Sequence, residues 1–202
     1  MKLYYMAKHD CSGKVRWLLE ELEVPYEEVQ LNYKDGDLKQ ESFLKKNPLG
    51  QVPVLEDGGV RLYESYAIVA YLADKFRDQS LAPDPTDLPA RGLYYQWLFF
   101  SIDSADDFFN RYFQLAQTSK DYQKQWGDYI EDKTRKILAA IEEQLDGRDY
   151  ILGAFSAIDA CLGYALWSIS EDPLFDEFPR AQAYFSRLKA RPACIRSHVF
   201  QA

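Results

Sequence analysis

The sequence predicts an α/β domain followed by an all-helical domain. In roughly the first 77 residues, short β-prone runs alternate with amphipathic helical stretches. The remainder shows helical periodicity throughout. Residues 78–89 lie between the two regions and are rich in Pro and Asp, which is typical of a linker because proline restricts the backbone and removes a donor. We therefore expect domains at residues 1–77 and 90–202, joined by residues 78–89.

Composition narrows the class of protein. The chain has 202 residues, a net charge of −8 and 47% hydrophobic residues, as expected for a globular protein. It contains no apolar run of about 18 residues that would predict a membrane span and no secretory leader, so we expect a cytoplasmic protein. The acidic balance disfavours nucleic acid as a partner. Cys11, Cys161 and Cys194 have no paired spacing, so neither a disulfide framework nor a metal site is expected.

The first domain opens with a β-prone run at residues 2–5. Four apolar residues then recur at helical spacing and predict a helix: Val15, Leu18, Leu19 and Leu22. Residues 26–31 alternate like a half-buried strand. Residues 52–55 and 60–62 form two short runs on either side of an Asp-Gly turn, which predicts a hairpin, and residues 65–76 carry a helical stripe. The order β-α-β, irregular connection, β-β-α is that of a thioredoxin-like domain.

The second domain is predicted to be a bundle of helices at about residues 90–114, 120–145, 156–170 and 179–190. Ser156-Ala157-Ile158-Asp159 gives the third of these a cap-like start, with apolar Phe155 before it. Such a start satisfies amide groups that the first turn of a helix leaves without partners.

Two short segments of the first domain suggest a binding role. Val52-Pro53 lies where a thioredoxin-like fold places a cis proline, which would turn the Val52 backbone outward to pair with an extended peptide. The alternative is a trans proline that starts an edge strand. Ser65 is a good N-cap for the following helix, and the N–H groups of that turn can also bind a carboxylate. Nearby lysines at positions 39, 45 and 46 are ordinarily solvated.

Longer motifs resemble the cytosolic glutathione transferase family. The pattern N-P-x-G-x-V-P-x-L at residues 47–55, followed by E-S-x-A-I at residues 64–68, is similar to the glutathione-binding half of these proteins. Residues 15–22 resemble the family's first helix, residues 155–159 the capping motif of its C-terminal domain, and residues 188–193 its last helix. The resemblance therefore touches both predicted domains.

The resemblance implies that the first domain binds glutathione and that the helical domain supplies an acceptor pocket. By position, the Val52 backbone beside Pro53 should pair with the cysteinyl part of glutathione. Glu64 and Ser65 should hold its γ-glutamyl end, and Gln51 with Lys39 or Lys45 its glycyl end. It further implies a homodimer, a detoxification role and conjugation of the glutathione thiolate to a small apolar electrophile, without a metal.

The group that stabilises the thiolate is left open by the sequence, because the segment before the first helix holds several candidates. A thiolate is the nucleophile in such chemistry, and related classes stabilise it with Tyr, Ser or Cys. Ser12 and Cys11 rank first together; Cys11-Ser12 resembles the bacterial beta class with shifted spacing. Tyr5 ranks third and His9 fourth. Asp10 would oppose a thiolate, and Ser12 has a plain alternative role as a helix cap.

The acceptor pocket is suggested by an excess of aromatic residues between positions 94 and 113. They are Tyr94, Tyr95, Trp97, Phe99, Phe100, Phe108, Phe109, Tyr112 and Phe113. The alternative is that most of them pack in the bundle core or in a subunit interface. Residues that face a cleft would favour flat or apolar electrophiles.

Two further kinds of protein remain open at this point. One is a different glutathione-dependent enzyme on the same fold: an isomerase, lyase, dehalogenase or thiol reductase. A dithiol cycle is excluded, because Lys14 stands where a resolving cysteine would follow Cys11. The other is a protein that binds glutathione without turnover.

Overall fold

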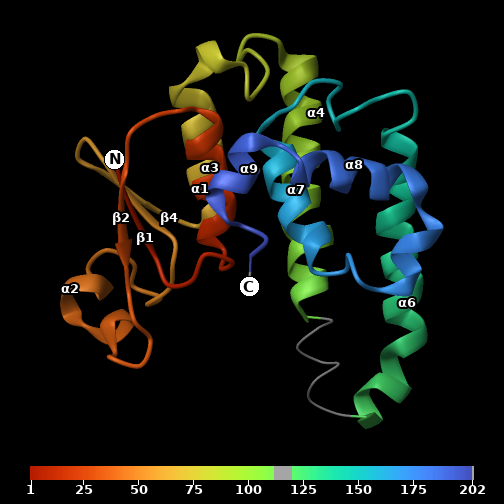
Figure 1. Ribbon diagram of the computed structural model, residues 1–202, viewed down its shortest axis with the longest axis horizontal. Helices are drawn as coiled ribbons and strands as arrows, with labels where there is room; N and C mark the ends of the chain where they lie inside the picture. The colour runs from red at the N-terminus through yellow and green to blue at the C-terminus, as the bar shows by residue number, and fades with distance from the viewer. Residues whose placement is uncertain (112–119, 202) are drawn as a thin grey trace. The chain divides into compact units, whose positions relative to one another are not determined.

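The computed structural model describes residues 1–111 and 120–201 and divides the chain into two compact units (Figure 1). The first unit comprises residues 1–82 together with 189–202, and the second comprises residues 83–188. The closing residues, from 189 onward, thus group with the first unit, whereas the sequence pattern predicted them as part of the helical domain. The contacts that hold them there are described below.

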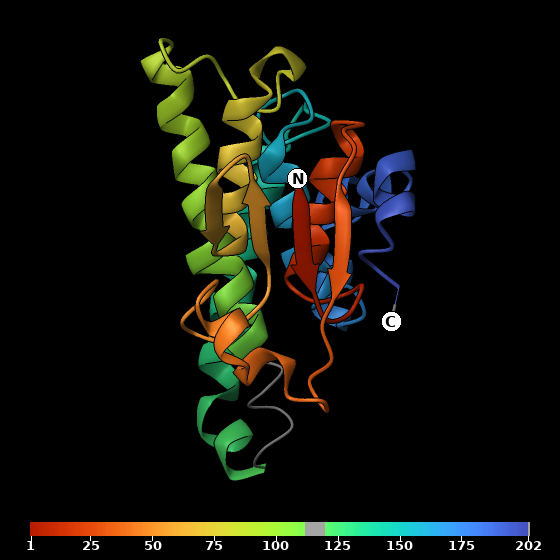
Figure 2. The ribbon, with the colours of Figure 1, turned by 90° about the vertical axis from the view of Figure 1, so that its left-hand side faces the viewer.

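The first unit is built on a four-stranded mixed sheet in the order β2-β1-β3-β4, which faces the viewer in Figure 2. Its strands are β1 (Lys2–Tyr5), β2 (Glu27–Gln30), β3 (Val54–Asp57) and β4 (Val60–Tyr63). β1 is parallel to β2 and antiparallel to β3, which forms a hairpin with β4. β3 begins two residues later than the sequence pattern suggested, after Pro53, which has no N–H to donate to a ladder.

Helices cover both faces of this sheet, as Figures 1 and 2 show. α1 (Ser12–Glu21) and α3 (Ser65–Lys75) lie on one face, whereas α2 (Glu41–Leu44) lies on the other. Two 3-10 turns, η1 (Asp37–Lys39) and η2 (Arg77–Gln79), complete the unit together with α9 (Pro192–Ser197), which packs on α1. The short α2 falls in the stretch that the sequence indicated only as an irregular connection.

Alternation along the strands builds a core on each side of the sheet. Tyr4 and Val54 pack with Leu38 and Phe43, which η1 and α2 supply. Leu3, whose side chain alternates with that of Tyr4, is fully buried in the direction of α1 and α3. The predicted α/β thioredoxin-like class is confirmed for this unit.

The second unit is helical, as predicted. Its helices are α4 (Leu88–Phe99), a π-helical segment η3 (Phe100–Asp106), α6 (Lys120–Gln144), α7 (Ala157–Trp167), a 3-10 turn η4 (Pro173–Glu177) and α8 (Pro179–Lys189). The sequence predicted one helix over residues 90–114; the π segment interrupts it, and α-helix resumes at residues 107–111. Its predicted end, from residue 112, lies outside the described residues. α7 packs against α4 and η3 and is buried along nearly its whole length.

The start of α7 is a fully buried polar network. Ser156 is the N-cap, and the predicted cap-like motif is a capping box. The Asp159 carboxylate accepts hydrogen bonds from the Ser156 N–H at 2.7 Å, the Ser156 hydroxyl at 2.9 Å and the Ile151 N–H at 3.2 Å. The Tyr184 hydroxyl donates to the same carboxylate at 2.8 Å. Burial nevertheless raises the Asp159 pKa, because desolvation outweighs these hydrogen bonds.

Among the described residues, no helix is both long and apolar enough to cross a membrane.

Candidate functional site

The strand register brings the predicted binding residues to one end of the sheet. Tyr4 of β1 is opposite Val54 of β3, and Val54 is opposite Tyr63 of β4. One residue beyond these pairs, Tyr5 follows Tyr4, Pro53 precedes Val54 and Glu64 follows Tyr63. All three predicted positions therefore lie at the same end of the sheet. The candidate site is therefore assembled from the end of β1, the start of β3 and the start of α3.

The segment before β3 leaves backbone hydrogen-bonding groups unused. The Val52-Pro53 bond is cis, as one of the two sequence alternatives proposed. Among the described residues, no hydrogen bond uses the Val52 N–H or carbonyl, although Val52 is half-buried. The neighbouring Gln51 is exposed, and its carbonyl accepts from Asn47 Nδ2 at 2.7 Å. Val52 thus offers an unused donor and acceptor, the groups that an added strand needs.

A glycine holds this segment close to η1. Gly50 has φ +62°, and a Cβ placed on it would come within 2.9 Å of the Leu38 carbonyl oxygen. A side chain at position 50 is therefore disfavoured both by backbone conformation and by space. Because Lys39 follows Leu38, the close approach places Lys39 on the element beside the Val52 segment.

The start of α3 presents a carboxylate and the N–H groups of a helix. Glu64, not Ser65, is the N-cap; Ser65 is the first helical residue and is buried. The sequence expectation that Ser65 caps α3 is thus wrong by one position. Glu64 is exposed and adopts φ +71°, a region that non-glycine residues rarely occupy. Such outliers concentrate at functional sites, and the N–H groups of the first turn can bind an anion.

The three candidate lysines differ in their partners. Lys45 pairs with Glu41 at 2.7 Å and Lys46 with Glu56 at 2.6 Å. Lys39 is exposed and has no acidic partner among the described residues. Lys39 is therefore the lysine of this group whose charge is left for an anionic ligand.

The loop between β1 and α1 is organised by Asp10. One carboxylate oxygen accepts from the N–H groups of Met6 at 2.8 Å and Ala7 at 2.9 Å, and the other accepts from Ser12 N–H at 2.7 Å. Asp10 thus supplies the acceptor that the first turn of α1 needs. This contact also places a negative charge at the helix start.

The candidate thiolate donors lie in different environments. Cys11 is the N-cap of α1 and is exposed, but its side chain makes no capping hydrogen bond. Ser12 is the first helical residue, fully buried, and its hydroxyl has no hydrogen-bond partner within the described parts of the chain. Tyr5 is buried at the end of β1, and His9 is exposed in the loop. Ser12 therefore does not cap α1, the alternative role that the sequence suggested for it.

Arg16, which no sequence motif indicated as a site residue, supports this loop. Its side chain is buried, and its guanidinium donates to the Glu28 carboxylate and to the Lys8 carbonyl, the latter at 3.0 Å. Its Cζ also lies 4.6 Å from the centre of the Tyr5 ring. Burial opposes ionisation of Glu28, but hydrogen bonds from Lys8 and Arg16 prevail and lower its pKa. Only its place among the apolar residues of the predicted first helix could have indicated that Arg16 is buried.

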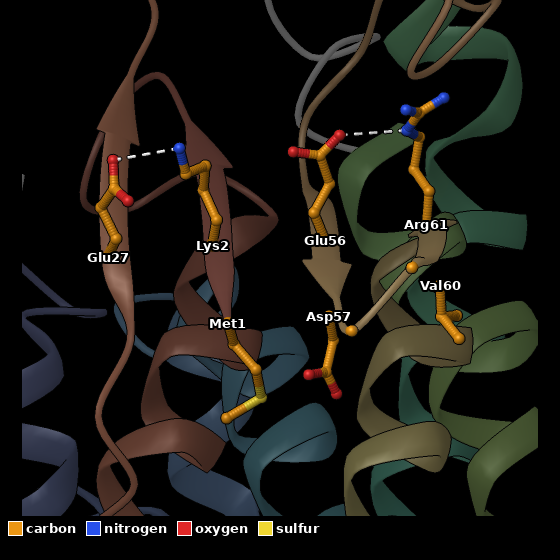
Figure 3. A pocket seen from close by; sticks show the side chains of 9 residues that line it. Met1, Lys2, Glu27, Glu56, Asp57, Val60 and Arg61 are labelled. Atoms are coloured by element: carbon orange, nitrogen blue, oxygen red, sulfur yellow. Dashed lines mark hydrogen bonds and ion pairs between the residues drawn. The ribbon is translucent and has the colours of Figure 1, made fainter.

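A depression of about 440 Å³ lies at the opposite end of the sheet, where β1 begins and the β3–β4 hairpin turns. Figure 3 shows the side chains that line it. Glu27 pairs with Lys2 at 3.3 Å, and Glu56 with Arg61 at 3.1 Å. A hydrogen bond from Lys46 is the main reason that the Glu56 pKa falls to about 2. These carboxylates already pair with cations, so ion pairs line the depression. It lies at the end of the sheet opposite to the predicted site.

The aromatic cluster of the second unit divides between core and surface. Tyr94, Trp97 and Phe109 are buried, as the packing alternative proposed, whereas Tyr95 and Phe99 are exposed. Tyr112 and Phe113 lie outside the described residues. A depression of about 810 Å³ over the π segment is lined by Gln96, Phe99, Phe100, Ile102, Asp103, Ser104, Asp107 and Arg111. Its lining mixes aromatic with charged groups.

The cysteines and carboxylates of the described residues form no metal centre: no group of three or more His, Cys, Asp or Glu is arranged to hold an ion. None of the three cysteines is in a disulfide. Cys161 and Cys194 are buried, and burial raises the Cys194 pKa to about 12. Cys11 is thus the exposed thiol of the chain.

Comparison with known proteins identifies the class. The family model described as "Glutathione S-transferase, N-terminal domain" matches residues 1–74. Glutathione S-transferase hmp2 of Hypomyces subiculosus is 30% identical over 216 residues, covering 98% of this chain and 97% of the relative. A glutathione S-transferase of Hyoscyamus muticus is 30% identical over 208 residues, covering 96% and 95%. The chain belongs to the glutathione S-transferase family.

A solved structure agrees with this assignment over nearly the whole chain. A glutathione transferase from Burkholderia graminis, with two glutathione molecules bound per subunit, superimposes with a TM-score of 0.85 at 27% identity. The match covers 97% of this chain and 86% of the other.

Proposed function

We propose that this protein binds glutathione at the edge of the sheet formed by Val52, Glu64 and Ser65. The observation that carries the proposal is the convergence of an unused backbone N–H and carbonyl at Val52 with the helix start at Glu64. Membership of the family, and the glutathione bound in the Burkholderia graminis structure, support glutathione as the ligand.

The chemistry of glutathione fits these groups. Its peptide middle matches the Val52 backbone, which Pro53 positions. Its γ-glutamyl end carries an ammonium for the Glu64 carboxylate and a carboxylate for Ser65 and the first N–H groups of α3. Its glycyl carboxylate needs a cation, and Lys39 with Gln51 is favoured over Lys45, which already pairs with Glu41.

Glu64→Ala tests the placement by calorimetry. The variant leaves the ligand ammonium without its acceptor, and a hydrogen bond to a charged group is worth about 1.5–3 kcal/mol, so we expect an affinity loss of about tenfold or more. Glu27→Ala is the matched control, because Glu27 is an exposed glutamate of the same unit at the far end of the sheet. Unchanged affinity in a folded Glu64→Ala protein would show that the placement is wrong.

For the reaction, we propose conjugation to small apolar electrophiles. The bound thiolate attacks an electrophilic carbon, a carbon–sulfur bond forms, and the leaving group departs with the bonding electrons. The aromatic surface at Phe99 and Phe100 supports a flat acceptor. An isomerase, lyase or dehalogenase reaction would begin with the same thiolate and differ in the acceptor.

A second candidate function is the glutathione-dependent reduction of disulfides through the Cys11 thiol. It is favoured by the exposure of Cys11, whereas Ser12 and Tyr5 are buried. The Cys11 thiolate attacks a glutathione mixed disulfide of the substrate at the glutathione sulfur and releases the substrate thiol. A second glutathione thiolate then attacks the Cys11–glutathione disulfide, giving glutathione disulfide and restoring the Cys11 thiolate. The entering glutathione thiol is the reductant: the mixed disulfide of the substrate becomes the substrate thiol and the two glutathione sulfurs end as glutathione disulfide, so electrons balance.

The absorbance of the glutathione thiolate, measured against pH in three variants, shows which of the candidate side chains stabilises the thiolate. Loss of thiolate stabilisation in Ser12→Ala or in Tyr5→Phe identifies the hydroxyl responsible. In Cys11→Ala, loss of any mixed disulfide and of reductase activity identifies thiol transfer. If all three titrate like the parent, near the free thiol value of about 8.5, the protein binds glutathione without activating it.

We further propose a homodimer in the cytoplasm. Exposed apolar side chains on α4 support a buried interface: Leu88, Leu93 and Tyr95. Sedimentation that finds only a 23.5 kDa species at micromolar concentration would overturn the dimer.

A further inference from the structure

The end of the chain packs on the first turn of α1. Val199 is fully buried, and a Cβ placed on Gly13 would lie 2.6 Å from the Val199 Cγ2 atom and 3.1 Å from the Lys8 carbonyl oxygen. The Phe200 ring meets the Trp17 ring edge to face, with centroids 5.7 Å apart. The absence of a side chain at position 13 thus lets the helix start, the preceding loop and the chain end approach one another.

Arg16 joins the same three segments. Its Nη1 donates to the Lys8 carbonyl of the loop at 3.0 Å and to the Ser197 carbonyl of the chain end at 3.4 Å. Its Nε donates to Glu28 of β2, and its guanidinium lies over the Tyr5 ring. One buried cation therefore links the strand end, the loop and the chain end.

The helix before this segment is anchored separately. Arg191 makes a two-point pair with Glu21 at 2.6 and 2.8 Å, and Arg196 pairs with Glu20 at 2.9 Å (α1 and α9 in Figure 1). Residues 199–202 can consequently be removed while the ion pairs of α9 and the Ser197 carbonyl remain.

We propose that residues 197–200, which we call the C-terminal clamp, hold the β1–α1 loop in place and thereby restrain the reactivity of Cys11. Arg16 is the positioning residue of this device, since it contacts loop and clamp at once. A clamp that is displaced, by a partner or by cleavage, frees residues 8–11 and makes Cys11 react faster. The inference goes beyond the proposed function, because it concerns contacts within the chain and its test uses no glutathione.

The test measures two quantities on the whole protein: the rate of Cys11 alkylation by iodoacetamide, followed by mass spectrometry, and trypsin cleavage after Lys8. We expect a chain that ends at His198, and Val199→Ala, to raise both by about threefold or more, because local opening becomes easier. Cys161 and Cys194, both buried, are internal standards whose slow reaction should not change. Ile195→Ala is the matched control, since Ile195 lies on α9 and is 55% exposed.

A compensating pair distinguishes the clamp contact from a general loss of stability. Gly13→Ala alone drives a methyl group against Val199, and Val199→Ala alone removes the packing. Together they add one methyl group at position 13 and remove two at position 199, including the Val199 Cγ2 atom that the new methyl group would meet, so we expect the double variant to return to within about twofold of the parent. Equal rates in the parent and in the chain that ends at His198 would overturn the proposal. Additive effects in the double variant would also overturn it. If Gly13→Ala does not fold, the shortened chain decides alone.

Discussion

Two helices of this protein begin with a buried serine and an aspartate, yet the two starts are built differently. At α7, Ser156 and Asp159 satisfy each other, and the carboxylate also takes donors from Ile151 and Tyr184. At α1, the Asp10 carboxylate precedes the helix and accepts a hydrogen bond from the Ser12 N–H. The Ser12 hydroxyl is buried without a partner among the described residues, and Cys11 is exposed.

The comparison shows that the N-terminus of α7 has a structural role, whereas the N-terminus of α1 keeps groups that can take part in chemistry. A buried network is stabilising when every member has a partner, and an unsatisfied hydroxyl costs free energy. The α7 start therefore contributes to the stability of the second unit. The α1 start gives up some stability and keeps polar groups beside the proposed glutathione site.

The largest expected effect is on the α7 side. Asp159→Ala removes the acceptor of four buried donors, and we expect the free energy of unfolding to fall by roughly 3–5 kcal/mol. Urea unfolding followed by circular dichroism measures the loss. Asp159→Asn retains one acceptor oxygen and should lose less; an equal loss in both variants would mean that the charge, not the acceptor, matters.

The matching change on the α1 side is Asp10→Ala. It leaves the N–H groups of Met6, Ala7 and Ser12 without an acceptor, and because the site is partly exposed we expect a smaller loss of about 1–2 kcal/mol. Hydrogen exchange of these three amides should accelerate. Removing the negative charge should also lower the pKa of a thiol bound nearby, so a thiol pKa that rises instead would contradict the proposed location of the sulfur.

The two serines give the closest comparison. Ser156→Ala loses the hydroxyl of a capping box and should cost about 1 kcal/mol. Ser12→Ala removes a buried hydroxyl that has no partner within the described residues, so we expect it to raise the free energy of unfolding by about 1 kcal/mol. Denaturation midpoints of the two variants, measured side by side, test this asymmetry. Equal losses would show that Ser12 has a structural role.

The smallest expected effect is a difference in pH dependence. The folded state lowers the pKa of Glu28, so its stabilisation is present above its unfolded pKa and is lost as the pH falls through the folded value. Burial raises the pKa of Asp159, so its contribution is present at low pH and is lost as the pH rises through the folded value. Between about pH 7 and pH 4, we expect Glu28→Gln to flatten the loss of stability and Asp159→Asn to steepen it, measured by urea midpoints.

Much of the fold was accessible from local patterns. The alternation and helical spacing of the first half indicated every strand and both long helices, because side-chain direction in these elements follows directly from the backbone period. The π segment within residues 90–114 was not indicated, since its hydrophobic pattern differs little from that of a continuing helix. The assignment of Ser65 as an N-cap failed because the backbone of Glu64 turns one residue earlier.

The binding half of the candidate site was indicated by its motif, but its supporting residues were not. Arg16 looks like an ordinary helix arginine in the sequence, and its burial depends on Glu28 and on the Lys8 and Ser197 carbonyls. Asp10 was noted only as an opposing charge, whereas its hydrogen bonds to three amides require the folded loop. No local pattern predicts contacts between residues so far apart in the chain.

The sequence by itself determined the order of strands and helices, the two kinds of region and the residues at the sheet edge where glutathione is proposed to bind. These properties follow from periodicity and short motifs, which operate over a few residues. The tertiary structure alone decided that the chain end packs on α1, that Ser12 is buried while its neighbour Cys11 is exposed, and that Lys39 has no acidic partner among the described residues. These properties depend on which distant groups share a small volume, and burial and pairing in that volume set the energies of charges and hydroxyls.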